Sequence, residues 1–333
     1  MRRRAQAWRT ALATLAAIVV VIALLPGIAP NDPGRSFPDR AYAPPMRLHV
    51  RDASGFRAPF VREQVLRDRL LRQFDEGRAL PLRWFQHGHL VTIDPTAGPL
   101  LFLGGDPLGR DVFARLVHGA RLSLGVAALG TIGALFIGAL IGALAGTSGG
   151  TIERVLMLAA DFVLVLPGAY LVLALRGVLP LVLSRAQVFG WMTVLFALSA
   201  WPHVARGVRA IVATERVRDY AEALRAAGAG RWRLARQFLP AARGFLTVEI
   251  VLIMPALLVA EATLSFLGLG FPPPEASWGT MLQDAQNVGV LGGAPWLVAP
   301  AAAIFIVVFA LHLASGTRAD SALLALTRAR PDR

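Results

Sequence analysis

Two acidic residues stand within strongly apolar stretches, where a carboxyl group could bind a proton or contact a passing solute. Asp161 opens the stretch DFVLVLP, and Glu261 opens EATLSFLGLG. An ionisable side chain inside a membrane span is costly unless it faces water, a partner or the interior of the helix bundle. Each carboxyl therefore marks either a translocation path or a buried hydrogen-bonded strut, and we favour the strut for both. An ion-coupled carrier that uses both groups for protons stays open as an alternative.

The sequence lacks the side chains that several classes of enzyme require. It contains no Lys, which a P-loop ATPase needs for its phosphates and a Schiff-base enzyme needs as its amine, and no Cys for thiolate chemistry or disulfides. His87 and His89 stand close together, but no Cys or carboxylate lies at a convincing ligand spacing. We therefore expect no catalytic residue, no metal site and no cofactor, and any ATP must be hydrolysed by a partner.

The composition is typical of a protein with several membrane spans. Hydrophobic residues make up 55% of the chain, and charged residues only 17%. The net charge of +13 could suggest nucleic-acid binding, but the arginines lie beside apolar runs and are not interleaved with aromatic residues. Anionic lipid headgroups and loop orientation explain this charge better.

Apolar runs long enough to cross a bilayer divide the chain. A spanning helix needs roughly 20 largely apolar residues, and runs bounded by charge, Pro or Gly predict six spans. They cover residues 11–28, 120–145, 155–175, 188–211, 244–269 and 297–315. Pro167 and Pro255 predict kinks within two of these runs, and Gly133, Gly138 and Gly142 allow a second helix to pack closely.

The arginines predict the side of the membrane on which each loop lies. The first run follows the basic sequence MRRRAQAWR and is closed by Pro26, so an uncleaved anchor with a cytoplasmic N-terminus is favoured over a secretion signal. The positive-inside rule then places the loop between spans four and five, and the tail at 316–333, in the cytoplasm. The arginines assigned to that loop are Arg206, Arg209, Arg216, Arg218, Arg225, Arg231, Arg233, Arg236 and Arg243.

The polar segment at 30–119 is expected outside the membrane, as an insert between the first two spans. Within it, PFVREQVLRDRLLRQFDEG places Val61, Val65, Leu66, Leu70 and Phe74 on one side of a helix that Gly77 would end. We therefore expect an amphipathic helix here. The insert is either a small cap packed on the spans or a surface that docks a partner. No internal repeat is visible, which argues against a secondary transporter built from inverted halves.

The stretch DYAEALRAAGAGRWRLARQFLP combines small residues with arginines. Its Ala-rich first part predicts a helix over 220–227 that can lie close against another protein, and Gly228 and Gly230 allow a sharp turn. A second helix over 231–238 would end before Pro240. The alternative is a solvated basic loop made of good helix formers.

This stretch resembles the E-A-A…G…L-P loop of permease subunits in binding-protein-dependent ABC importers. The matching residues are Glu222, Ala223, Gly228, Leu239 and Pro240, while Leu224 stands where that loop has a second Ala. The resemblance implies short coupling helices that sit in a groove of a cytoplasmic ATPase. The residues expected to couple the ATPase are Tyr220, Glu222, Ala223, Gly228, Leu239 and Pro240.

Three further stretches resemble the dipeptide/oligopeptide/nickel branch of this family, and in particular its C-type subunit. They are GGDPLGRDVFARLVHGARLSL, EATLSFLGLGFPPPEASWGTML and DFVLVLP, in the family's order along the chain. Physically, Asp111 flanked by Arg110 and Arg115 predicts an ion-paired anchor at the membrane interface, with solute contact as the minority alternative.

The resemblance implies an all-α membrane protein with six transmembrane helices in the type I ABC importer permease fold. The expected parts are an N-terminus with the first span at 1–29, the insert at 30–119, and a core at 120–315 with its coupling loop at 212–243. The implied partners are a second homologous permease, two ABC ATPases, an extracytoplasmic solute-binding protein and the lipid of a bacterial-type inner membrane. The resemblance does not identify the solute, because di- and oligopeptides, nickel chelates and some oligosaccharides are handled by this branch.

Overall fold

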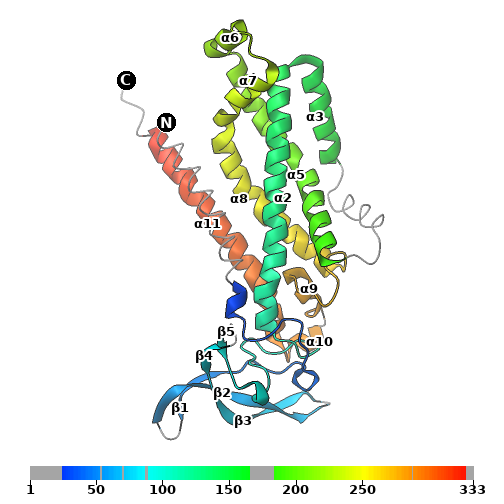
Figure 1. Ribbon diagram of the computed structural model, residues 1–333, viewed down its shortest axis with the longest axis vertical. Helices are drawn as coiled ribbons and strands as arrows, with labels where there is room; N and C mark the ends of the chain where they lie inside the picture. The colour runs from blue at the N-terminus through cyan, green and yellow to red at the C-terminus, as the bar shows by residue number, and fades with distance from the viewer. Residues whose placement is uncertain are drawn as a thin grey trace. The chain divides into compact units, whose positions relative to one another are not determined.

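The computed structural model describes residues 25–52, 55–69, 71–86, 89–165, 184–286 and 288–327. These residues belong to two compact units. Unit 1 holds the described residues within Val126–Ala260 and Phe305–Thr327, and unit 2 holds those within Leu25–Gly125 and Glu261–Ile304. Three long helices, α2, α8 and α11, contribute residues to both units, and each unit is described by itself below (Figure 1).

Unit 1 is helical throughout its described part. It contains most of α2 (Val112–Ser148), α3 (Gly150–Val165), α5 (Arg185–Arg216), most of α8 (Arg243–Phe266) and the end of α11 (Ala299–Thr327). Two short helices, α6 (Asp219–Ala226) and α7 (Arg231–Phe238), and the 3-10 turn η4 (Leu239–Ala242) connect α5 to α8. Figure 1 shows α6 and α7 beyond the end of α5, at the same end of the unit as the connection between α2 and α3.

Unit 2 combines a small β structure with short helices. Strands β1 (Leu48–Asp52), β2 (Gly55–Asp68) and β3 (Gln73–Pro81) form an antiparallel sheet, and β4 (Arg83–Gln86) pairs with β5 (His89–Thr92). The remaining short elements are η1 (Leu25–Ile28), η2 (Pro38–Arg40), η3 (Pro95–Ala97), α9 (Trp278–Gln283), α10 (Val288–Leu291) and η5 (Pro295–Val298). Val61 and Leu80 face one another across β2 and β3 and contribute to a small apolar core with Met46 and Leu101.

The amphipathic helix expected around 59–77 is wrong, and so is the all-α assignment for the insert. Val65, which the helical pattern places on a buried stripe, is 44% exposed, while Phe60 is fully buried. Gly77 ends no helix, because it lies within β3 where a Cβ would come within 2.9 Å of Val65 Cγ2. Pairing with β1 and β3 satisfies the backbone hydrogen-bonding groups of β2. The local spacing of apolar residues also fits a helix, but this pairing with distant segments makes the stretch a strand.

Four of the six expected spans correspond to described helices that are long and apolar enough to cross a membrane. They are Val112–Ser148, Arg185–Arg216, Arg231–Phe266 and Pro295–Leu313. The expected run at 11–28 lies almost entirely outside the described residues. The run at 155–175 begins within α3 and continues outside them. α2 begins at Val112, within the range 30–119 that we expect for the insert.

A stripe of glycines brings α2 close to α5, as the sequence predicts for Gly133, Gly138 and Gly142. A Cβ on Gly138 would lie 2.5 Å from Val204 Cβ, and one on Gly142 would lie 2.5 Å from the Ala205 carbonyl oxygen. The stripe continues with Gly130 against Phe196 and Gly146 against Val212. Small residues at such a contact let two backbones approach, which is how helices associate where lipid removes the hydrophobic driving force.

We expect Gly138→Ala to destabilise the protein, because the new methyl group would overlap Val204 and the Trp201 carbonyl oxygen. Overpacking of this kind typically costs about 1–3 kcal/mol, which should lower the midpoint of thermal unfolding in detergent by several degrees. The matched control is Gly190→Ala on α5, where nothing lies within 4 Å of the added Cβ. Equal midpoints for the two variants would contradict the close α2–α5 contact.

Candidate functional site

A helix–turn–helix connects the long helices α5 and α8, and its two helices begin and end within a residue or two of the expected positions. The turn depends on Gly228, whose φ of +77° is strained for any residue with a Cβ. Two bonds close the end of α6: the Gly228 N–H donates to the Arg225 carbonyl oxygen at 2.9 Å, and the Ala229 N–H donates to that of Leu224 at 3.0 Å. This glycine-dependent cap reverses the chain into α7.

Buried side chains hold α6 and α7 against the end of α5. Ala221 and Phe238 are fully buried, and the Tyr220 ring contacts Phe238 edge to face with 5.7 Å between the ring centroids. The Tyr220 hydroxyl donates to Glu215 Oε2 at 2.6 Å. Burial, with the contribution of Glu215, raises the pKa of Tyr220 to about 12, so the hydroxyl keeps its proton and remains a donor. The two short helices are thereby fastened to the long one.

The accessible surface of α6 presents small side chains together with the charged groups of Asp219, Glu222 and Arg225. Glu222 and Ala223 are exposed, as are Ala226 and Ala227 on the following turn. Glu222 has no ion-pair partner among the described residues. At the far end of the loop, Leu239 is half-buried and Pro240 is exposed, both within η4. The motif residues therefore lie on two separate short elements, and those on α6 form its accessible surface.

Asp161 forms an ion pair between α3 and α5 and is not buried. Its carboxylate accepts from Arg206 Nε at 3.1 Å, and the two side chains are 49% and 50% exposed. A second pair, between Glu153 and Arg209, joins the same two helices. Arg206 and Arg209 thus lie within α5 and not in the loop to which we assigned them. Asp161 connects two helices as a strut would, but the expectation that it is buried is wrong for the described chain.

Glu261 lies in unit 2 in a fully buried cluster with three serines. Ser265 donates to Glu261 Oε1 at 2.7 Å, whereas Glu261 Oε2 has no hydrogen-bond partner among the described residues, and Ser123 and Ser277 lie nearby. Ser123 accepts the Trp278 N–H at 3.0 Å, so the cluster connects α2, α8 and the start of α9. Gly279 lies so close to α8 that a Cβ would come within 2.4 Å of the Ala262 carbonyl oxygen. This arrangement suits a structural joint, the reading that we favour.

The charged cluster before α2 is ion-paired, but through a different carboxylate than expected. Asp106 accepts from Arg110 Nε at 2.6 Å and lies 3.4 Å from Arg115 Nε. Asp284 lies 3.7 Å from Arg110. Asp111 instead caps α2 by accepting the Phe113 N–H at 2.9 Å and the Asn31 side-chain amide at 2.8 Å.

The residues that sequence reasoning missed belong mostly to these two clusters. Asp106 stands four residues before Arg110, and this spacing of opposite charges could have predicted the ion pair from the sequence. Asp284, Ser277 and Asn31 are distant in sequence from their partners, and no local pattern identifies them. Among the described residues, no group of three His, Asp or Glu side chains could hold a metal ion. His89, one of the two neighbouring histidines, lies within hydrogen-bonding distance of the Ala29 carbonyl oxygen at 2.5 Å.

Comparison with known proteins gives a consistent set of similarities. A family model described as "Binding-protein-dependent transport system inner membrane component" matches residues 138–321. A protein of Brucella ovis named as a peptide permease is 37% identical over 214 residues, covering 63% of this chain and 68% of its own length. The oligopeptide transport system permease protein OppC of Bacillus subtilis is 34% identical over 229 residues, covering 68% of this chain and 72% of its own. The di/tripeptide permease DppC of Pseudomonas aeruginosa is 35% identical over 243 residues, covering 72% and 75%.

We expect Asp111 to make the stability of the protein depend on pH. Burial raises the pKa of this carboxyl from 3.8 to about 6. The hydrogen bonds from Asn31 and from the backbone act in the opposite direction and lower the pKa, but burial is the larger effect. Between these two pKa values, Asp111 keeps its proton in the folded chain and releases it in the unfolded chain. The stabilising contribution is complete below the unfolded pKa and is lost as the pH rises through about 6.

In a comparison with Asp111→Asn, the unfolding midpoint of the unchanged protein should fall further as the pH rises from about 4 to about 7. Asp284 also has a raised pKa, but it is present in both proteins, so the difference between them isolates Asp111. Parallel pH profiles of the two midpoints would show that Asp111 is not the responsible group.

Proposed function

Since the chain belongs to the family of binding-protein-dependent transport system inner membrane components, it is a permease subunit of an ABC importer, and we propose that its solute is a peptide. The support for a peptide comes from relatives named for peptide, oligopeptide and di/tripeptide transport. A relative named for glutathione transport is 33% identical, and glutathione is itself a small peptide. The size and sequence of the peptide would be selected mainly by a separate binding protein.

The observation that carries the coupling role is the accessible surface of α6. Exposed Ala223, Ala226 and Ala227 leave little side-chain bulk, so another protein can approach the helix backbone closely. Glu222, which has no ion-pair partner among the described residues, adds one negative charge for orientation. The proposed coupling residues are Tyr220, Glu222, Ala223, Gly228, Leu239 and Pro240, of which Tyr220 fastens α6 to α5 and Gly228 sets the turn.

The proposed work of the chain is conformational. Closure of two partner ATPases on ATP would move α6, and the Tyr220 contacts with Glu215 and Phe238 would transmit that movement to α5. Ion pairs and glycine contacts couple α5 to α3 and α2, so these helices would shift together between inward-open and outward-open states. The chain would bind no ATP itself, and a second, homologous permease would complete the path.

A proton-coupled carrier is less well supported by the same geometry. Asp161 is held in an ion pair with Arg206 that joins α3 to α5, as a structural link would. Glu261 is fully buried beside Ser123, Ser265 and Ser277, and Ser265 donates to its Oε1 at 2.7 Å, which suits a structural joint between segments. For both acids we propose a structural role, without direct contact with the peptide.

We expect Glu222→Arg and Gly228→Ala to uncouple peptide uptake from ATP hydrolysis while leaving the chain inserted. The first change reverses the only charge that motif residues present on α6. The second forces a side chain onto a φ of +77°, which costs roughly 1 kcal/mol and disturbs the turn. Uptake of a labelled peptide and ATP hydrolysis are measured together in proteoliposomes that contain the complete importer with its binding protein.

Gly230→Ala is the matched control, because Gly230 has an ordinary φ of −70° and nothing lies within 4 Å of an added Cβ. It should leave uptake near that of the unchanged protein. If Glu222→Arg and Gly228→Ala transported peptide as well as Gly230→Ala does, the coupling role of α6 would have to be abandoned. If no peptide were taken up by the unchanged importer, the proposed solute would be wrong.

We propose that α6, α7 and both chain termini lie in the cytoplasm, and a single cysteine tests this orientation. The chain has no Cys, so Gly230→Cys introduces a unique thiol at an open and exposed position. A membrane-impermeant maleimide should label it in inside-out vesicles but not in intact cells. Labelling of intact cells would reverse the proposed orientation.

A further inference from the structure

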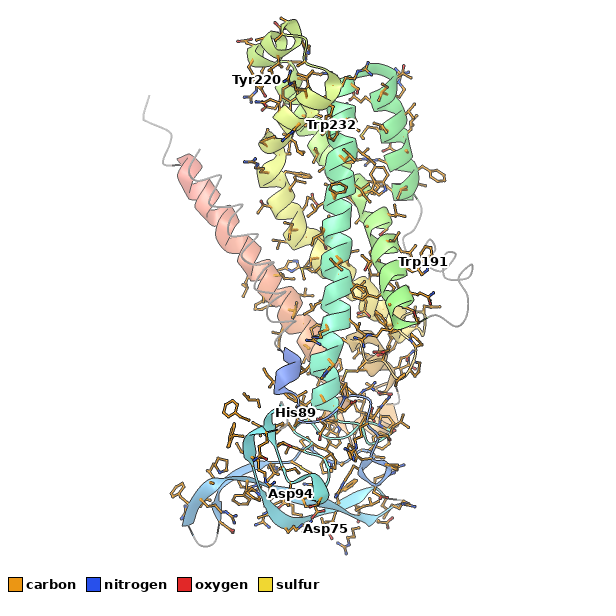
Figure 2. The ribbon with its side chains drawn as sticks, in the orientation of Figure 1. Asp75, His89, Asp94, Trp191, Tyr220 and Trp232 are labelled. Atoms are coloured by element: carbon orange, nitrogen blue, oxygen red, sulfur yellow. The ribbon has the colours of Figure 1, made fainter. Side chains whose placement is uncertain are left out.

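The short helix α7 has two different faces. Leu234, Ala235 and Phe238 are buried against the rest of unit 1, where α7 contacts α5 and η4. The opposite face consists of exposed Trp232, Arg233 and Arg236, which we call the α7 outer face. Trp232 is 63% exposed, an unusual position for the largest side chain unless something other than water covers it (Figure 2). Helical spacing brings these three side chains together, because Trp232 and Arg236 are one turn apart.

The arginines of this region differ in whether they have an acidic partner. Arg206, Arg209 and Arg218 pair with Asp161, Glu153 and Glu215. By contrast, Arg233 and Arg236 form no ion pair with any residue that the structure describes, and neither does Arg231 at the start of α7. The α7 outer face is therefore a concentrated and uncompensated positive charge beside an exposed indole.

The position of α7 along the chain places it at the surface of a bilayer. Through η4 it leads directly into α8, whose 24 residues extend about 36 Å at 1.5 Å per residue. The hydrocarbon core of a bilayer is about 30 Å thick, so the first turn of α8 at Arg243 lies near its boundary. α7 precedes that turn by the four residues of η4, which keeps it at the depth of the headgroups.

We propose that the α7 outer face binds the phosphate headgroup of an anionic phospholipid. A guanidinium group forms paired hydrogen bonds with phosphate oxygens, and a Trp ring prefers the boundary between headgroups and acyl chains. Arg233 and Arg236 supply the first interaction, and Trp232 supplies the second. An amphipathic helix with arginines and Trp on its accessible face is typical of binding at the membrane surface.

The charge of the neighbouring helix favours lipid over a protein partner for this face. α6 carries Asp219 and Glu222 in its first turn against a single Arg225, and its exposed residues are small. An anionic headgroup would be repelled from that surface, whereas a closely fitting protein would not. The two helices thus divide the loop into a protein-facing part and a lipid-facing part, and the lipid site depends neither on the solute nor on the coupling role of α6.

Quenching of Trp232 fluorescence by brominated lipid tests the proposal in the assembled importer. The importer is placed in nanodiscs of zwitterionic phosphatidylcholine that contain an equal small share of either brominated phosphatidylglycerol or brominated phosphatidylcholine. The difference between the unchanged importer and its Trp232→Phe variant isolates this indole from the other tryptophans. Each arginine at an anionic surface contributes a factor of about five, so Arg233 and Arg236 together should give roughly a 25-fold preference for the anionic quencher.

The variant Arg233→Gln/Arg236→Gln should lose this preference, while Arg67→Gln/Arg69→Gln should keep it. The second pair removes the same charge from arginine side chains of the insert that are 69% and 81% exposed. Equal quenching of Trp232 by the two brominated lipids would overturn the proposal. Quenching by neither would also overturn it, because it would show that a protein subunit covers the α7 outer face.

Discussion

The close contact between α2 and α5 is the constraint on which the helical unit depends. In a membrane, an apolar side chain gains little free energy when it exchanges lipid for another apolar side chain. Helices therefore associate through close packing and through polar interactions. The glycines of α2 let its backbone approach Val204, Ala205 and Val212 on α5. The Asp161 and Glu153 ion pairs then attach α3 to α5. α5 is thereby a rod in contact with two neighbours and able to transmit movement to both.

The helix–turn–helix that follows α5 packs against the end of this helix. Tyr220 and Phe238 fasten the two short helices to it, and Gly228 sets the angle between them. Charge then separates their accessible surfaces, since α6 is slightly acidic with small side chains and α7 is basic with an exposed Trp. A movement applied to α6 would act on a loop that lipid headgroups also hold. The partner ATPase would then contact α6, and the membrane would contact α7, within one short segment.

Polar groups buried in unit 2 hold its connections. The carboxylates of Asp106 and Asp284 lie beside Arg110 and Arg115, and Glu261 lies beside the hydroxyl groups of three separate segments. A buried charge is costly unless it is paired, and each of these clusters joins residues far apart in sequence. Such clusters specify which segments meet, a task that the apolar surfaces of membrane helices perform poorly.

The sequence by itself determined the apolar helices, the glycine contact surface, the helix–turn–helix and the family, because each depends on local spacing or on a contiguous motif. The helical period, the Gly and Pro residues at which helices end, and the charge of short loops are all local properties. The tertiary structure decided what depends on distant partners: β2 became a strand because β1 and β3 pair with it, and Asp106 took the role expected of Asp111. It also showed that Asp161 is exposed and that Arg233 and Arg236 lack acidic partners within the described chain. Pairing and burial are relations between separate segments, and no spacing within one segment determines them.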